Sequence, residues 1–196
     1  DRKRILQPII ERIYADEELL AQLQTLDNGI PYTFSRNSRA SGKAAAEVLD
    51  HFAGWADKLT GETYPQFSSA SNMHYMSFRE PVGVVAAIMP WNVPLSMFAK
   101  KIGPALACGC TVIAKPSENT NLAVHRLAEI FAESDLPPGV FNFVTGAGET
   151  GEALSTHLGV DKVSFTGSTA VGRRIVAASG SNMKRLSLEL GGKSAG

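Results

Sequence analysis

Two polar side chains, Asn92 and Lys115, each follow an apolar run that has the composition of a buried strand. The run 82–89 stops at Pro90, which cannot donate to a sheet ladder, and the run 111–114 stops at Lys115. A mostly apolar segment of helical length joins the two runs, which predicts a β-α-β unit with parallel strands. Ligands of open α/β sheets bind beyond the carboxyl ends of such strands, so an amide donor and an ammonium group are expected at a ligand-binding edge.

Two further groups belong to the same predicted edge. The segment 167–172 offers small side chains and N–H groups at the start of a helix, where a phosphate is favoured, although glycine there also serves helix–strand packing. Glu189, on the alternating strand 185–190, is a candidate general base, but such a Glu is more often simply solvent-facing. The alternative for Asn92, which lies in a proline-bounded turn, is a hydrogen bond to its own backbone. A buried Lys115 must be hydrated, paired or bound to a ligand.

Alternating helix and strand patterns supply the elements around these groups. Further strands are predicted at 140–144, 162–165 and 185–190, and the intervening helices are expected to be capped at Asn119-Thr120 and at Thr169. Five strands that alternate with four helices predict an α/β fold with a doubly wound, five-stranded parallel sheet.

The first 80 residues do not follow the sheet pattern. Apolar residues at intervals of three and four predict either one amphipathic helix or a helix pair that breaks near Asp16, ending at 27–29 and followed by a helix at about 40–58. Between 61 and 80 the period changes to two, which predicts a two-stranded hairpin with apolar groups on both faces. A lone hairpin of this kind needs another sheet or subunit to cover it. The expected apolar stripe of the helix 40–58 is Ala44, Val48, Phe52 and Trp55.

Composition excludes several classes of function. Of 196 residues, 44% are hydrophobic and 19% charged, as in an ordinary soluble domain, and 19 basic side chains balance 19 acidic ones. No global field therefore favours nucleic acid, and no apolar run approaches the length that spans a bilayer, so a cytoplasmic protein with no membrane partner is expected. Cys108 and Cys110 are too close for an ordinary disulfide, and with four scattered histidines no metal site is predicted.

Four motifs occur in a fixed order at the predicted strand ends: PWNVP, IAKPSE, FTGST-x-x-G and LELGGK. With these motifs the chain resembles the NAD(P)-dependent aldehyde dehydrogenase family over its whole length. The resemblance implies a Rossmann-like cofactor domain and oxidation of an aldehyde to a carboxylic acid through a cysteine thiohemiacetal and thioester. The family's nucleophilic cysteine lies downstream of LELGG, so the 196 residues are expected to be inactive alone. The alternative is a non-catalytic nucleotide-binding and assembly fragment.

The resemblance also implies roles for individual residues. Asn92 would supply the oxyanion-hole amide, and Glu189 would be the general base, which requires a carboxylate with a raised pKa. Lys115 would bond the adenosine ribose, and Glu118 would accept from it and repel a 2′-phosphate, which favours NAD over NADP. The implied cofactor-binding residues are Ile88, Met89, Pro90, Trp91, Lys115, Ser117, Glu118, Gly148, Phe165, Thr166, Gly167, Ser168, Val171, Leu190 and Gly191.

The organisation of the whole subunit is expected from the same resemblance. N-terminal helices (1–60), an oligomerisation hairpin (61–80) and a cofactor domain (81–196) would precede a catalytic domain absent from this chain. The intact subunit would form a homo-dimer or homo-tetramer and take an aldehyde as substrate. The helix after PWN could line the substrate channel through Val93, Met97 and Phe98. Cys108 and Cys110 precede a strand at its amino end, away from the ligand edge, and are interpreted as packing residues.

Overall fold

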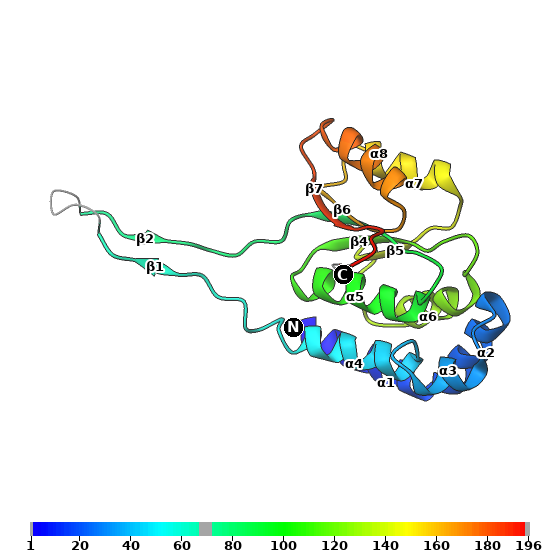
Figure 1. The fold of residues 1–196 in the computed structure, drawn as a ribbon. Coiled ribbons are helices and arrows are strands. Elements are labelled where there is room, and N and C mark those ends of the chain that lie inside the picture. Colours follow the sequence, from blue (N-terminus) through cyan, green and yellow to red (C-terminus); the bar gives the residue numbers. More distant parts are fainter. Residues whose placement is uncertain (1, 67–71, 195–196) are drawn as a thin grey trace.

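A five-stranded parallel sheet forms the centre of the computed structural model, which describes residues 2–66 and 72–194 (Figure 1). The strand order is β5-β4-β3-β6-β7, and every neighbouring pair is parallel. The predicted α/β fold with a doubly wound sheet is therefore confirmed. The strands are β3 (Val84–Ile88), β4 (Thr111–Lys115), β5 (Phe141–Phe143), β6 (Lys162–Thr166) and β7 (Arg185–Glu189).

The order of the strands creates one edge at which ligands of such sheets bind. The chain builds outward from β3 through β4 to β5, then returns to the other side of β3 for β6 and β7. The register pairs Ile88 with both Lys115 and Phe165, so the carboxyl ends of β3, β4 and β6 are level. The loops that diverge there enclose the topological switch point of a doubly wound sheet.

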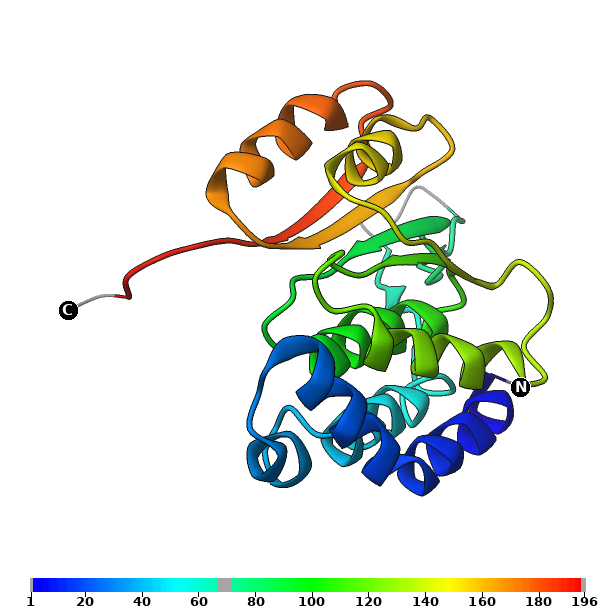
Figure 2. The ribbon, with the colours of Figure 1, turned by 90° about the vertical axis from the view of Figure 1, so that its right-hand side faces the viewer.

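Helices cover both faces of the sheet (Figure 2). On one face lie α5 (Pro94–Ala107) and α6 (Leu122–Ala132), and on the other lie α7 (Gly148–Thr156) and α8 (Thr169–Ser179). The alternation of β3 serves both layers, because Ala87 belongs to the apolar cluster of α5 and α6, whereas Ala86 and Ile88 belong to that of α8. A strand buried on both faces must be apolar throughout, as the run 82–89 is.

The N-terminal segment forms a further layer beneath α5 and α6 (Figures 1 and 2). It comprises α1 (Arg2–Ala15), α2 (Glu17–Asn28), α3 (Tyr32–Asn37) and α4 (Gly42–Ala53). The predicted break near Asp16 is confirmed, and α2 ends at Gly29, whose φ of 74° is the left-handed conformation that glycine adopts at a helix end. The short helix α3 was not predicted. No helix among residues 2–66 and 72–194 is long and apolar enough to cross a lipid bilayer.

The predicted helix 40–58 is right in type but wrong in length and in its buried face. Ser41 caps it by accepting from the N–H of Ala44 at 3.1 Å, and beyond Ala53 the chain continues only as tighter turns. The large side chains of the predicted stripe flank the contact, and Trp55 is 48% exposed. Small residues occupy the centre because they let α4 approach the neighbouring helices closely. The buried face of α4 consists of Gly42, Ala45, Ala46, Leu49 and Ala53.

The hairpin predicted between 61 and 80 extends away from the rest of the molecule as a long arm (Figure 1). Its paired strands are β1 (Thr63–Tyr64) and β2 (Tyr75–Met76), which are antiparallel. The Ser77 N–H donates to the carbonyl of Glu62 at 2.8 Å and extends the ladder towards the body. The two-stranded hairpin is confirmed over its described part, while residues 67–71 lie outside the described residues.

Both predicted helix caps are wrong by one or more residues. Ser168 and not Thr169 caps α8, because Ser168 has extended backbone angles and its Oγ accepts from the N–H of Val171 at 3.3 Å. Helix α6 begins after Asn121. The N–H of Leu122 donates instead to Asp27 Oδ2 at 2.8 Å, so a carboxylate of α2 caps a helix that is distant in sequence.

Candidate cofactor and active site

A cavity of about 470 Å³ lies between α7 and α8 at the carboxyl ends of β3, β4 and β6. All of the predicted cofactor residues except Leu190 and Gly191 line it. The cavity thus gathers residues from three separate motifs, which the parallel register brings to one edge. These residues are Ile88, Met89, Pro90, Trp91, Lys115, Ser117, Glu118, Gly148, Phe165, Thr166, Gly167, Ser168 and Val171.

Lys115 and Glu118 form a charged pair on the wall of this cavity. Lys115 is the last residue of β4, and its side chain is only 5% exposed, whereas that of Glu118 is 52% exposed. Lys115 Nζ donates to the carbonyl of Pro116 at 3.0 Å and lies 3.9 Å from Glu118 Oε2. Burial lowers the pKa of Lys115, and Glu118 opposes that shift. One backbone acceptor and one distant carboxylate leave the ammonium group capacity for a further acceptor, such as a ribose hydroxyl.

The amino terminus of α8 forms another part of the wall. The N–H of Val171 donates to the Ser168 cap, but the first-turn N–H groups before it have no intrahelical acceptors, and the helix dipole favours a negative group there. The turn at Gly167 packs closely on the Phe165 ring and has no room for a side chain, because a Cβ at this position would lie 2.5 Å from that ring. The buried Oγ1 of Thr166 has no hydrogen-bond partner among the described residues. Free donors and an orphan hydroxyl at this turn fit a phosphate-containing ligand.

A second, wider cavity of about 1220 Å³ adjoins the first and is called the groove below. It runs between α5 and the exposed face of β6 and β7, and it contains Asn92 and Glu189. Pro90, Trp91 and the turn 166–168 line both cavities and so form a shared rim. Leu190 and Gly191 lie in the groove. Both Asn92 and Glu189 are exposed among the described residues.

The chain that forms these cavities is similar to a family of known proteins. The sequence model described as "Aldehyde dehydrogenase family" matches residues 1–196. The chain belongs to the aldehyde dehydrogenase family. Aldehyde dehydrogenase, cytosolic 1, of Mus musculus is 45% identical over 196 residues, and the match covers 99% of this chain. Phenylacetaldehyde dehydrogenase of Pseudomonas fluorescens is 49% identical over 201 residues, covering 98% of this chain.

Solved aldehyde dehydrogenase structures agree with the fold. A putative aldehyde dehydrogenase from Burkholderia cenocepacia superposes with a TM-score of 0.93 at 47% identity, covering 99% of this chain and 39% of that one. PnpE in complex with nicotinamide adenine dinucleotide gives a TM-score of 0.93 at 46% identity, with the same shares covered. These neighbours have the Rossmann-like sheet that the motifs implied. The present chain spans 38% and 39% of the lengths of the two curated relatives above.

The sequence motifs of the aldehyde dehydrogenases did not predict a buried cation in the groove. Lys101 of α5 is 9% exposed, and its Nζ donates to Ser164 Oγ of β6 at 3.0 Å. Burial lowers the pKa of Lys101 to about 8, although Glu189 opposes the shift. The sequence signal was the pair Lys100 and Lys101 inside the mostly apolar segment 94–107, and it did not identify the buried one, because the polar partner of Lys101 comes from a distant strand.

Other parts of the cavity walls were also missed by the motif comparison. From α7 these are Gly151, Glu152, Ser155 and Thr156, from α8 they are Arg174, Ile175 and Ala178, and from the loops they are Asn119 and Ala147. The helical residues recur three, four, seven or eight residues after Gly148 and Val171, which were both predicted. Helical periodicity counted from those two residues could have found them.

The described thiols lie far from the shared rim. Cys110 is buried directly before β4, at the amino end of the sheet, and Cys108 is the exposed C-cap of α5. Desolvation raises the pKa of the Cys108 thiol, which disfavours the reactive thiolate. Both line the opposite end of the groove from Asn92. No cluster of three potential metal-ligating side chains occurs within residues 2–66 and 72–194.

One expectation for the substrate channel is wrong. Phe98 is completely buried and packs edge-to-face on Phe131 at a ring distance of 5.3 Å, so it belongs to the core of α5 and α6. Its neighbour Met97 is half-buried and does line the groove. The two side chains differ because consecutive helical residues point about 100° apart.

Proposed function

We propose that this chain is the NAD-binding part of an enzyme that oxidises an aldehyde to a carboxylic acid. One observation carries the proposal: the predicted cofactor residues except Leu190 and Gly191 line one cavity, whose rim is shared with the groove that contains Asn92 and Glu189. A dinucleotide that extends from Lys115 across this rim would bring its far end close to an amide donor and a carboxylate.

The first cavity suits NAD in size and chemistry. Its volume of about 470 Å³ is within the usual range for small-molecule sites. The α8 amino terminus would hold the pyrophosphate, and Lys115 and Glu118 would bond the adenosine ribose. The Glu118 carboxylate would repel a 2′-phosphate, so NAD is preferred over NADP. NAD complexes of PnpE and of a Bacillus cereus aldehyde dehydrogenase support this assignment, whereas one similar structure is that of an NADP-dependent enzyme of E. coli.

Asn92 and Glu189 in the groove then each have a chemical task. NAD supplies the hydride acceptor when it is bound. Asn92 donates its amide N–H to the aldehyde oxygen as a thiolate adds to the carbonyl carbon and negative charge develops. Glu189 accepts a proton from the water that hydrolyses the thioester. The thiolate comes from a cysteine outside these 196 residues, since Cys108 and Cys110 lie at the wrong end of the sheet.

Glu189 needs a covering surface for this task. A carboxylate becomes a stronger base when apolar neighbours desolvate it, yet Glu189 is exposed at the end of β7. The groove beside it is the natural place for a further part of the polypeptide to pack. We infer that the aldehyde binds between the groove and that further part.

Steady-state kinetics of the intact polypeptide that carries this chain test the proposal. Asn92→Ala is expected to lower kcat for aldehyde oxidation by about 10²–10³-fold, because one oxyanion donor is lost, with little change in the Kd for NAD. Glu118→Gln is expected to improve turnover with NADP relative to NAD, because the repulsion of a 2′-phosphate is removed.

Matched controls keep this test specific. Asn37→Ala removes an exposed amide of α3, and Glu11→Gln removes an exposed carboxylate of α1; neither should change the kinetics. An Asn92→Ala enzyme as active as these controls would refute the oxyanion role. NAD binding without any NADH formation by the intact polypeptide would favour the alternative, a nucleotide-binding and assembly module.

A further inference from the structure

The part of the cavity that lies between α7 and α8 is called the slot below. On α7, a Cβ added at Gly148 or Gly151 would meet nothing within 4 Å, so this side is open. On α8, Val171 and Ile175 face the same cavity and provide an apolar surface. A slot between two helices with one bare wall and one apolar wall suits a flat aromatic ring.

An ion pair spans the two helices at this slot. Arg174 Nη2 of α8 donates to Glu152 Oε2 of α7 at 3.0 Å, and both residues line the cavity. The side chains are 69% and 59% exposed, so the pair lies at the mouth and not in the interior. Exposed pairs of this kind contribute little to stability, so the pair is not needed to hold the two helices together.

The remaining groups of the cavity determine which part of a nucleotide reaches the slot. The α8 amino terminus attracts phosphate, and Lys115 with Glu118 suits ribose hydroxyls. The base is then left for the slot. A guanidinium is planar and binds aromatic faces, and a carboxylate that holds it by hydrogen bonds limits its rotation.

We propose that Arg174 is a binding residue for the purine base of the cofactor, and that Glu152 positions its guanidinium across the mouth of the slot. The inference rests on the nucleotide-binding function proposed above. Arg174 would cover the base on the solvent side, while Val171 and the glycines of α7 contact it within the slot. Glu152 would act only through Arg174.

Binding of three ligands to the intact polypeptide tests the role of Arg174. Arg174→Ala is expected to weaken the binding of NAD and of AMP by about two- to fivefold, which is the range for an exposed cation on an aromatic ring. Nicotinamide mononucleotide, which has a phosphate and a ribose but no adenine, should bind as it does to the wild type. Arg173→Ala is the matched control, because Arg173 is exposed on the same helix and does not line the cavity.

A double-mutant cycle tests the role of Glu152. Glu152→Gln should weaken AMP binding less than Arg174→Ala does. The double variant should bind AMP with the same affinity as Arg174→Ala, because Glu152 acts through the arginine. Glu149→Gln, an exposed carboxylate of α7 outside the cavity, should have no effect. Additive losses in the double variant would overturn the positioning role.

Two further outcomes would contradict the inference in distinguishable ways. Equal weakening of AMP and nicotinamide mononucleotide by Arg174→Ala would show that Arg174 serves the phosphate and not the base. Unchanged binding of all three ligands would exclude Arg174 from the site while leaving NAD binding itself intact. Failure of the wild type to bind NAD would instead refute the proposed function, and the inference with it.

Discussion

At the scale of single residues, Lys101 is a buried cation whose pKa is shifted by its environment. Its ammonium group lies beneath the groove with Ser164 Oγ as its hydrogen-bond acceptor at 3.0 Å. Burial penalises the charged form, and for this reason the pKa of Lys101 falls from 10.5 to about 8. A hydroxyl is a weak partner for a cation, so the folded chain retains this charge at a cost in stability.

The stability of the chain should therefore depend on pH through Lys101. Between pH 8 and 10.5 the unfolded chain holds a proton that the folded chain has released, so this group's contribution to the unfolding free energy rises with pH. Lys101→Met should stabilise the chain by about 1–2 kcal/mol at pH 7, where the penalty is full, and by less at pH 10. Urea unfolding at the two pH values measures both.

Lys100→Met provides the comparison for this prediction. Lys100 precedes Lys101 on α5 and is exposed, so its replacement should change the unfolding free energy by less than about 0.5 kcal/mol at either pH. A gain from Lys101→Met that is the same at pH 7 and pH 10 would contradict a lowered pKa. It would mean that methionine improves packing alone.

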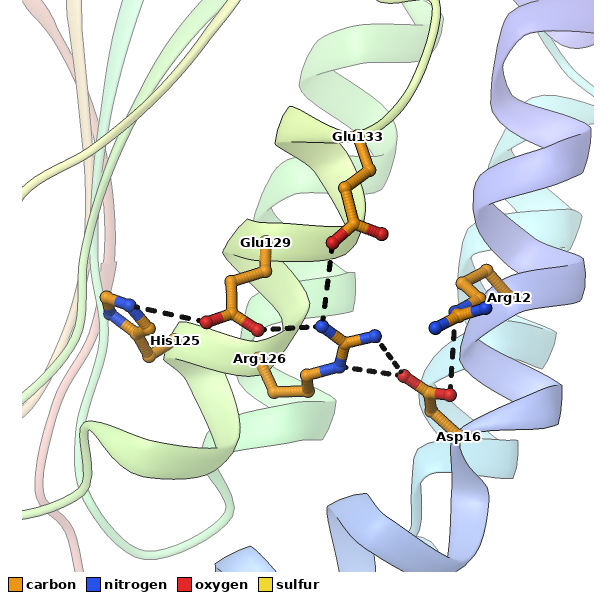
Figure 3. A network of polar contacts seen from close by, with 6 residues as sticks. All are labelled: Arg12, Asp16, His125, Arg126, Glu129 and Glu133. Carbon is orange, nitrogen blue, oxygen red and sulfur yellow. Dashed lines mark hydrogen bonds and ion pairs between the residues drawn. The ribbon is translucent and has the colours of Figure 1, made fainter.

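At the scale of elements, the N-terminal helices form polar contacts with α6, which covers the sheet (Figure 3). Arg126 of α6 donates to Asp16 Oδ2 between α1 and α2, with its Nη2 2.6 Å away, and its Nη1 lies 2.7 Å from Glu129 Oε2. Arg126 and Asp16 are only 15% and 14% exposed. Asp16 also pairs with Arg12 at 3.5 Å, and thus charges from three helices meet at one point.

Breaking this cluster should destabilise the chain more than breaking a surface pair does. Arg126→Met is expected to lower the unfolding free energy by about 2–3 kcal/mol, because it leaves the poorly exposed Asp16 carboxylate with fewer donors. Arg36→Met, which breaks the exposed pair with Glu18, should cost less than about 1 kcal/mol. Chemical denaturation measures both unfolding free energies. An equal decrease for the two variants would show that Arg126 does not stabilise the contact between the helices more than a surface pair does.

At the scale of the whole molecule, the hairpin arm extends away from the body (Figure 1), and large apolar side chains on it are exposed. Met73 is 61% exposed, Met76 55% and Phe78 76%. A two-stranded ladder also has unpaired N–H and C=O groups along its outer edges, and such edges pair with other chains. We propose that the arm is an association surface, which the intact subunit uses to form a closed homo-dimer or homo-tetramer.

The 196-residue chain should accordingly self-associate through the arm. Sedimentation velocity is expected to show a sedimentation coefficient that increases with protein concentration, and the double variant Met76→Lys, Phe78→Lys should reduce this increase because it places charge on the edge. Met183→Lys is the control, since Met183 is 89% exposed on the opposite part of the chain. A wild-type chain that stays monomeric at every concentration, with its secondary structure intact, would contradict the proposal.

The sequence by itself determined the order and type of the elements that carry the site. Apolar runs that end at proline or lysine are typical of strands buried on both faces, and the intervening helical patterns indicated that those strands are parallel. Parallel strands have their carboxyl ends at one edge, so Asn92, Lys115 and Gly167 could be placed together before any contact was known. Those inferences depend on local periodicity, which the sequence contains directly.

Only the tertiary structure decided the contacts between segments that are distant in the chain. Asp27 caps α6, Ser164 accepts from Lys101, and Glu152 holds Arg174 across the slot. Helix α4 buries Ala45, Ala46, Leu49 and Ala53 and not the predicted stripe that ends in Phe52 and Trp55, because neighbouring helices pack closely on that face. In each case the partner lies many residues away and is selected by packing. Periodicity reports which face of an element is apolar, but the atoms opposite that face are set by how the layers assemble.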